Sequence, residues 1–222
     1  MRRFVFAALV VPLCFAIAKS QEPKDQSTFI DLQPKANQEL RAKLSDNYPD
    51  SHLGELPQGE QKLGSAVYKI GPGCVCLGST LKTTKPDKVE IPVKQKFAKL
   101  YLLHATQYGG TPEGPTHVPD GTLIGQYMVR YSDGSGEGIE IVYGEDVRDW
   151  WNWDKSKETK RGKVVWTGNN PTAQMFELDV RLYESTWTNP KPDLEVVSIT
   201  YSSRMDTPGA PFCVAITVIT KP

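Results

Sequence analysis

Short apolar segments separated by glycine- and proline-containing turns restrict the fold of this chain more than any other feature. The sequence holds about ten of them, and no region has the length and periodicity of a long helix. Short strand signals spaced by turn signals predict two packed antiparallel sheets. We therefore expect an all-β chain, an antiparallel β-sandwich of the jelly-roll type. The expected strands are 29–32, 66–70, 74–77, 89–93, 99–106, 122–131, 138–143, 164–167, 174–184, 194–202 and 212–220.

Two local patterns support this reading. The runs 122–131 and 138–143 flank Asp133 and Gly134, a pair that suits a hairpin turn with positive φ. The run 212–220 is apolar on both faces, which favours a central or buried strand. Elsewhere, residues 34–44 begin with a proline and predict one or two helical turns, and residues 45–64 predict a loop.

Residues 1–20 have the order of a secretory signal peptide. Arg2 and Arg3 precede an apolar run, and Ala16 and Ala18 offer small residues for cleavage. The apolar run is short for a bilayer span, and no later segment is long and apolar enough for one. We therefore expect a secreted or periplasmic protein without a membrane span after cleavage. The remaining chain would comprise a flexible leader over 21–28 and a single domain over 29–222.

The charge balance restricts the partners. The chain has 26 basic and 26 acidic residues and no basic stripe. A protein that binds nucleic acid or an anionic membrane surface usually carries a basic patch. We therefore expect neither of them as a partner.

Three cysteines remain when Cys14 leaves with the signal peptide. Cys74 and Cys76 lie two apart on an expected strand, so both face one side. We expect Cys213 to lie near one of them, with all three buried, and export would permit a disulfide from Cys74 or Cys76 to Cys213. The alternative is that all three are small apolar core residues. With three scattered histidines, we expect no metal site and no cofactor.

All five tryptophans fall between 150 and 187, and three of them lie in the acidic segment 143–154. Flat apolar rings beside hydrogen-bonding groups on a loop suit sugars, which have an apolar face and many hydroxyls. The alternative is a buried corner that joins the sheets. Because neighbours on a strand point to opposite faces, we expect one of Trp150 and Trp151 to pack inward and the other to stay partly exposed. We also expect Arg148 to pair with a neighbouring acid such as Asp146 or Asp149.

We expect three loops, 107–120, 144–154 and 185–193, to gather at one end of the sandwich. The first is long and rich in glycine and proline, a kind of loop that often carries function. His104 lies outside them on an apolar strand face, where a histidine is more often a hydrogen-bonded core residue than a catalyst. The candidate ligand-binding residues in these loops are Tyr108, His117, Asp149, Trp150, Trp151, Asn152, Trp153, Trp187 and Asn189.

Several segments resemble one known module. They are residues 56–64, 96–106, 144–151, 164–171, 180–203 and 211–218. The module occurs in exported bacterial proteins and at the ends of some bacterial glycosidases, and it is related to galactose-binding-like and NPCBM-type domains. The resemblance spans residues 29 to 220. It implies a jelly-roll sandwich with binding loops at one end, and carbohydrate binding usually without catalysis.

The function that we expect is therefore non-enzymatic carbohydrate binding outside the cytoplasm, with a glycan or a cell-envelope polysaccharide as partner. The alternative is a structural or interaction domain of the envelope without a small-molecule site, whose partners are other envelope proteins. A glycosidase needs two carboxylates across a cleft, and carboxylates close in sequence are weak evidence for one. The serine-hydrolase motif Gly-x-Ser-x-Gly does not occur. We therefore expect no catalytic residue.

Overall fold

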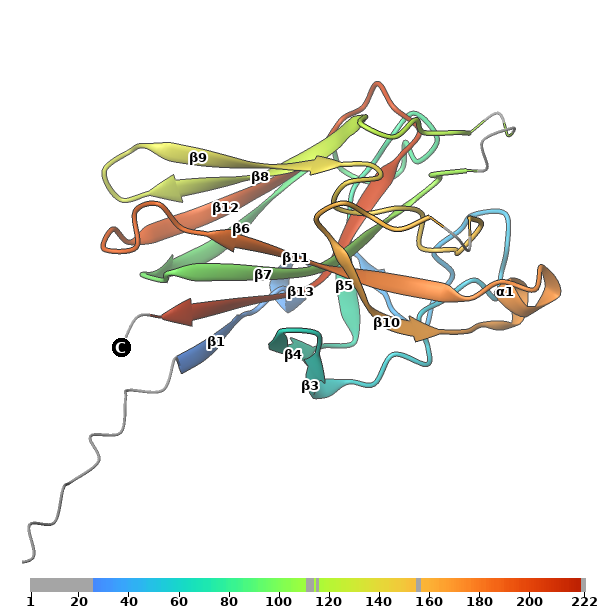
Figure 1. The fold of residues 1–222 in the computed structure, drawn as a ribbon, viewed down its shortest axis with the longest axis horizontal. Coiled ribbons are helices and arrows are strands. Elements are labelled where there is room, and N and C mark those ends of the chain that lie inside the picture. The colour runs from blue at the N-terminus through green and yellow to red at the C-terminus, as the bar shows by residue number, and fades with distance from the viewer. Residues whose placement is uncertain (1–25, 111–113, 115, 155–156, 221–222) are drawn as a thin grey trace, which may run out of the picture.

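The computed structural model describes residues 26–110, 114, 116–154 and 157–220. This part of the chain is nearly all β, in antiparallel sheets that pack together (Figure 1). The prediction of an all-β sandwich is confirmed. The expected signal peptide over 1–20 lies outside the described residues. Residues 26–28, which we expected in the flexible leader, belong instead to the first strand because they pair with the last one.

The larger sheet has the order β10-β11-β7-β13-β5-β2, and β1 also pairs with β13. β13 therefore lies at the centre, and its residues are buried up to Val218. This confirms the prediction from its apolar sequence. The strands of this sheet are β1 (Gln26–Ile30), β2 (Gln38–Glu39), β5 (Gly73–Cys76), β7 (Lys99–Gln107), β10 (Lys163–Gly168), β11 (Val180–Thr188) and β13 (Ala210–Thr220).

The second sheet has the order β6-β12-β8-β9, and β3 and β4 form a separate pair. The hairpin between β8 and β9 is confirmed. Gly134 has a φ of 83°, and the Asp133 carboxylate accepts the Ser135 backbone N–H at 2.9 Å. The bounds are β3 (Gly59–Leu63), β4 (Ala66–Ile70), β6 (Lys88–Gln95), β8 (Leu123–Tyr131), β9 (Gly136–Val142) and β12 (Val196–Ser203).

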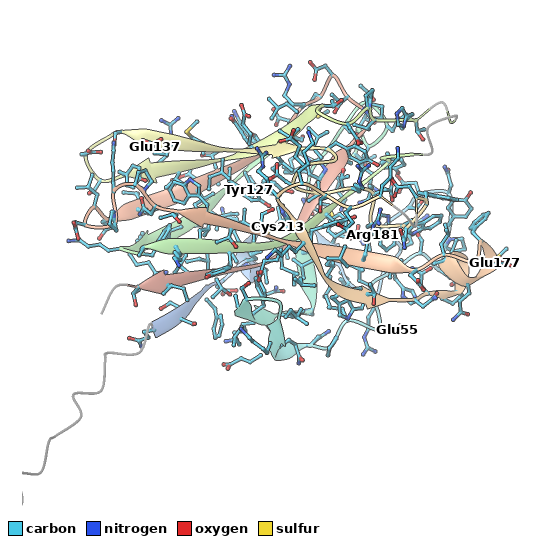
Figure 2. The ribbon with its side chains drawn as sticks, in the orientation of Figure 1. Glu55, Tyr127, Glu137, Glu177, Arg181 and Cys213 are labelled. Carbon is cyan, nitrogen blue, oxygen red and sulfur yellow. The ribbon has the colours of Figure 1, made fainter. Side chains whose placement is uncertain are left out.

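The core between the sheets combines aromatic rings and thiols. Tyr127 and Tyr201 stack with their ring centroids 4.4 Å apart, and Tyr127 and Cys213 lie in the interior of the molecule (Figure 2). Cys213 pairs with Val75 in the sheet, so it lies beside the strand that carries Cys74 and Cys76. The predicted proximity and burial of these thiols are thus confirmed.

The possible disulfide from Cys74 or Cys76 to Cys213 does not form. All three are free and fully buried. Cys74 and Cys76, both on β5, have Sγ atoms 3.7 Å apart and are not disulfide-bonded. Burial raises the pKa of Cys213 to about 12, so its thiol stays protonated. The alternative assignment, small apolar core residues, describes them.

Three segments differ from the sequence prediction. Residues 34–44 hold only a short 3-10 helix (Gln33–Lys35) and β2, and the expected loop 45–64 contains β3. The strand expected over 174–184 starts later, because helix α1 (Pro171–Met175) precedes it. Pro171 suits a first helical position, and the Asn170 side chain caps the helix by accepting the Ala173 backbone N–H at 2.8 Å.

Across the described residues, no helix has the length and apolar character needed to cross a membrane.

Candidate functional site

A pocket of about 530 Å³ opens where four separate parts of the chain meet. We call it the aromatic pocket, because five rings line it: Tyr48, Tyr108, Trp150, Trp151 and Trp153. Polar side chains share the lining, namely Ser45, Asp46, Asn47, Gln107, Thr116 and Asp149. The structure thus gathers four of the predicted aromatic residues around one space. It adds Tyr48 and Gln107, which the sequence analysis did not select.

Asp149 holds two of these segments together. Its Oδ2 accepts the backbone N–H of Gly109 at 2.6 Å and that of Gly110 at 3.4 Å, and its Oδ1 accepts the N–H of Trp151 at 2.8 Å. Burial raises the pKa of Asp149 to about 6, and these donors oppose the increase. The carboxylate therefore joins the loop after β7 to residues 143–154, which we call the tryptophan segment. Its oxygens are used within the fold instead of facing a ligand.

Both Trp150 and Trp151 are buried, with 3% and 4% of their surface exposed. The expectation that one of them stays partly exposed is wrong. The backbone here makes isolated bridges, Thr106 to Asp149 and Trp151 to Val180, and no regular strand, so side chains need not alternate between faces. Trp150 meets Phe212 of β13 edge-on at 6.3 Å between ring centroids.

Trp151 and Trp153 belong to a contiguous aromatic group. The Trp151 ring lies 5.3 Å from the rings of both Tyr48 and Trp153. Phe176, just after helix α1, contacts all three of them. Trp153 and Tyr48 are only half-buried, so they are the rings best placed to meet a ligand.

Two buried arginines, Arg148 and Arg181, hold the tryptophan segment in place through hydrogen bonds. Arg148 binds Asp120 through two nitrogens at 2.9 and 2.8 Å, and Asp154 at 3.2 Å. The expectation that Arg148 pairs with a neighbouring acid is confirmed for Asp154. The two acids given as examples, Asp146 and Asp149, are not its partners, because those carboxylates bind Arg161 and backbone N–H groups. A bidentate geometry of this kind suits guanidinium and carboxylate groups.

Arg181 of β11, labelled in Figure 2, is the second of these arginines. It donates to Asp154 at 2.9 Å, to the Asn152 side chain at 2.7 Å and to the Asp149 carbonyl at 3.1 Å. The side-chain oxygen of Asn152, a predicted ligand residue, therefore accepts a hydrogen bond within the fold. It does not line the aromatic pocket.

The third predicted loop lies at the other end of the molecule. β11 begins at Val180, which is bridged to Trp151, and ends at Thr188, so nine residues at about 3.3 Å each separate the two ends. Trp187 packs on Phe97 with the ring centroids 6.4 Å apart. The expectation that all three loops gather at one end is therefore wrong, because a continuous strand keeps the third away.

Asn189 and His117 also lie outside the aromatic pocket. Asn189 is buried, accepts the Tyr131 hydroxyl at 2.6 Å and donates to the Phe97 carbonyl at 2.8 Å, so its polar groups are used within the fold. His117 is half-buried, and its backbone N–H closes a turn on Gly114 at 3.2 Å.

A second cleft, of about 620 Å³, opens between β9 and β11 and contains Trp187. His104 is part of its lining. The Nε2 atom of His104 is hydrogen-bonded to Ser185 Oγ at 2.8 Å, and its Nδ1 atom is hydrogen-bonded to the Tyr127 hydroxyl at 3.4 Å. Burial lowers the pKa of His104 to about 4, so the ring is neutral near pH 7. This confirms a hydrogen-bonded core histidine. A serine, a histidine and a carboxylate form the catalytic triad of serine hydrolases. Here Tyr127 stands in the place of the carboxylate, and its hydroxyl lacks the negative charge that stabilises a protonated histidine.

The loop after β7 depends on glycine for its close approach to the site. A Cβ at Gly109 would lie 2.6 Å from the Tyr143 hydroxyl oxygen and 2.9 Å from Asp149 Cβ. We expect Gly109→Ala to lower the free energy of unfolding by about 1–3 kcal/mol, since overpacking forces neighbours to shift. Urea denaturation measures the change. Gly138→Ala is the control, because its nearest neighbour is 3.6 Å away, an ordinary contact. Equal stability of the two variants would contradict this account.

The described residues contain no group of three or more histidine, cysteine, aspartate or glutamate side chains placed to hold a metal ion. The resemblance to galactose-binding-like modules stays a prediction. Comparison of the chain with family models, with curated proteins and with solved structures returned no match.

Proposed function

We propose that this protein is a non-enzymatic binding protein that holds a sugar ring of an extracytoplasmic glycan in the aromatic pocket. One observation carries the proposal: five aromatic rings, from segments far apart in the sequence, line one pocket together with hydrogen-bonding side chains. A sugar offers an apolar face to such rings and hydroxyl groups to the polar side chains. The volume falls within the range of about 300–1,000 Å³ that is usual for ligand pockets.

The rigid surroundings of the aromatic pocket support binding as its purpose. Asp149, Arg148 and Arg181 fix the tryptophan segment through hydrogen bonds that do not involve a ligand. A wall held in place before binding loses less conformational entropy when the ligand arrives. The half-buried rings of Tyr48, Tyr108 and Trp153 then provide the accessible part of the lining.

The second candidate function is a structural or interaction domain of the cell envelope. The burial of both Trp150 and Trp151 favours it, because these rings join the tryptophan segment to the core. The two functions make different demands on Trp153. A binding protein needs this ring at the pocket surface, whereas a structural domain would need it only for packing.

Replacement of Trp153 by alanine separates them. We expect the variant to lose at least about tenfold in affinity for its glycan, since covering one large apolar side chain contributes about 1.5–3 kcal/mol. The melting temperature should change little, because the side chain is only half-buried. A glycan array followed by titration calorimetry measures the affinity, and calorimetric unfolding measures the stability. Trp187→Ala, in the other cleft, is the matched control and should bind normally.

Absence of any bound glycan across the array would refute the proposal. A large loss of stability in Trp153→Ala without a bound ligand in the unchanged protein would favour the structural domain.

A further inference from the structure

Two polar atoms in the lining of the aromatic pocket have no hydrogen-bond partner within the described part of the chain. They are Nε1 of Trp151, a donor, and Oε1 of Gln107, an acceptor, and both are shielded from solvent. Trp151 and Gln107 both line the aromatic pocket. The amide nitrogen of Gln107 has only a long contact of 4.0 Å, to the sulfur of Cys76. The residues that line the pocket thus include one with an unused donor and one with an unused acceptor.

Unpaired buried polar groups are uncommon in native proteins, because folding has removed their water without a replacement. Nδ1 of His117 and the hydroxyls of Tyr183 and Tyr201 are unpaired as well, but none of these three residues lines the aromatic pocket. Trp151 and Gln107 differ in that both residues line the aromatic pocket, so a small rotation of either side chain would turn its unpaired atom toward a bound ligand. A ligand that brings an acceptor for Trp151 and a donor for Gln107 would form two hydrogen bonds that the free protein lacks.

We infer that the aromatic pocket selects an N-acetylated sugar, and this inference rests on the proposed glycan binding. The acetamido carbonyl accepts the Trp151 Nε1–H, and the acetamido N–H donates to Gln107 Oε1. The methyl group packs on the aromatic lining. A hydroxyl must serve both partners through one oxygen atom, whereas an acetamido group accepts and donates through different atoms and adds an apolar contact. Gln107 and Trp151 are therefore specificity-determining residues.

The inference can be tested with ligands that differ at a single position. β-1,4-linked trimers of N-acetylglucosamine and glucose share a backbone and differ only in the group on carbon 2. The methyl glycosides of N-acetylgalactosamine and galactose form a second such pair. Titration calorimetry of the mature chain should show that an acetylated ligand binds at least about tenfold more tightly than its unacetylated partner, the loss expected when a built hydrogen-bonding site meets a ligand without the group.

The variant Gln107→Met tests the residue itself. It removes the acceptor and keeps a similar volume, so the protein should fold with equal or greater stability. We expect the preference for the acetylated trimer over the glucose trimer to fall by about tenfold. A purely structural effect would weaken both ligands equally. Gln126→Met is the control, because Gln126 lines the cleft between β9 and β11.

The outcomes separate this inference from the proposed function. Equal affinity within both ligand pairs, or no binding of either acetylated ligand, overturns the inference. If the glycan array then shows other sugars bound in a manner that depends on Trp153, the proposed glycan binding stands without acetyl selectivity. An array without any bound glycan refutes both.

Discussion

Replacement of Trp150 by alanine is expected to lower the free energy of unfolding by about 3–5 kcal/mol. Only 3% of the surface of this residue is exposed, and its ring meets Phe212 of the central strand β13 edge-on and lies 5.8 Å from the Trp151 ring. Its loss would leave a cavity under the aromatic pocket that rigid strands cannot fill. Urea denaturation monitored by circular dichroism measures the change.

The contrast with Trp153→Ala makes this result informative. The two tryptophans lie three positions apart and both line the aromatic pocket, but only Trp150 is fully buried. We expect the Trp150 variant to lose stability and the Trp153 variant to lose mainly ligand affinity. A Trp150 variant as stable as the unchanged protein would show that the tryptophan segment does not anchor to β13.

The pH dependence of stability should reveal two opposing groups. Burial raises the pKa of Asp149 from 3.8 to about 6, so the folded protein binds the extra proton between these values, and stability falls as the pH rises through that window. Burial lowers the pKa of His104 from 6.5 to about 4, so the unfolded chain binds the extra proton there, and stability rises with pH. The two slopes offset each other between about pH 4 and 6.

Variants separate the two slopes. In Asp149→Asn only the histidine contribution remains, and we expect the free energy of unfolding to rise by about 3 kcal/mol between pH 4 and 6.5. In His104→Gln the aspartate contribution remains, and stability should fall over the same range. Urea titrations at closely spaced pH values, relative to the unchanged protein, measure both slopes. Identical pH profiles for the three proteins would show that these two side chains do not control the pH dependence.

Local signals in the sequence were sufficient to predict the sheets. The Asp133-Gly134 pair predicted the hairpin, and the apolar run 212–220 predicted the central strand β13, because turn geometry and two-sided burial are encoded within a few residues. The sequence also indicated Trp150, Trp151, Trp153 and Tyr108, since aromatic residues clustered near a glycine-rich loop. All four line the aromatic pocket.

The parts that sequence reasoning missed depend on contacts between distant segments. Nothing near Tyr48 indicates that it meets Trp151, about a hundred residues later in the chain, and Gln107 is the last residue of an ordinary strand. The misplacement of Trp187 and Asn189 has a similar cause. Both were assigned to a proline-rich loop, but strand pairing with β7 carries the chain as far as Thr188 and away from the aromatic pocket.

The pairing of β1 with β13 determines how the molecule can be presented to a surface. Gln26 lies opposite Thr220, and the neighbouring Ile219 pairs with Lys99, at the start of β7. Gln107, at the far end of the same strand, lines the aromatic pocket, about 25 Å away at the usual rise per residue. A tether attached beside Gln26 or Thr220 would therefore leave the entrance of the pocket unobstructed, so immobilised protein should remain open to large polymers as well as to short oligomers.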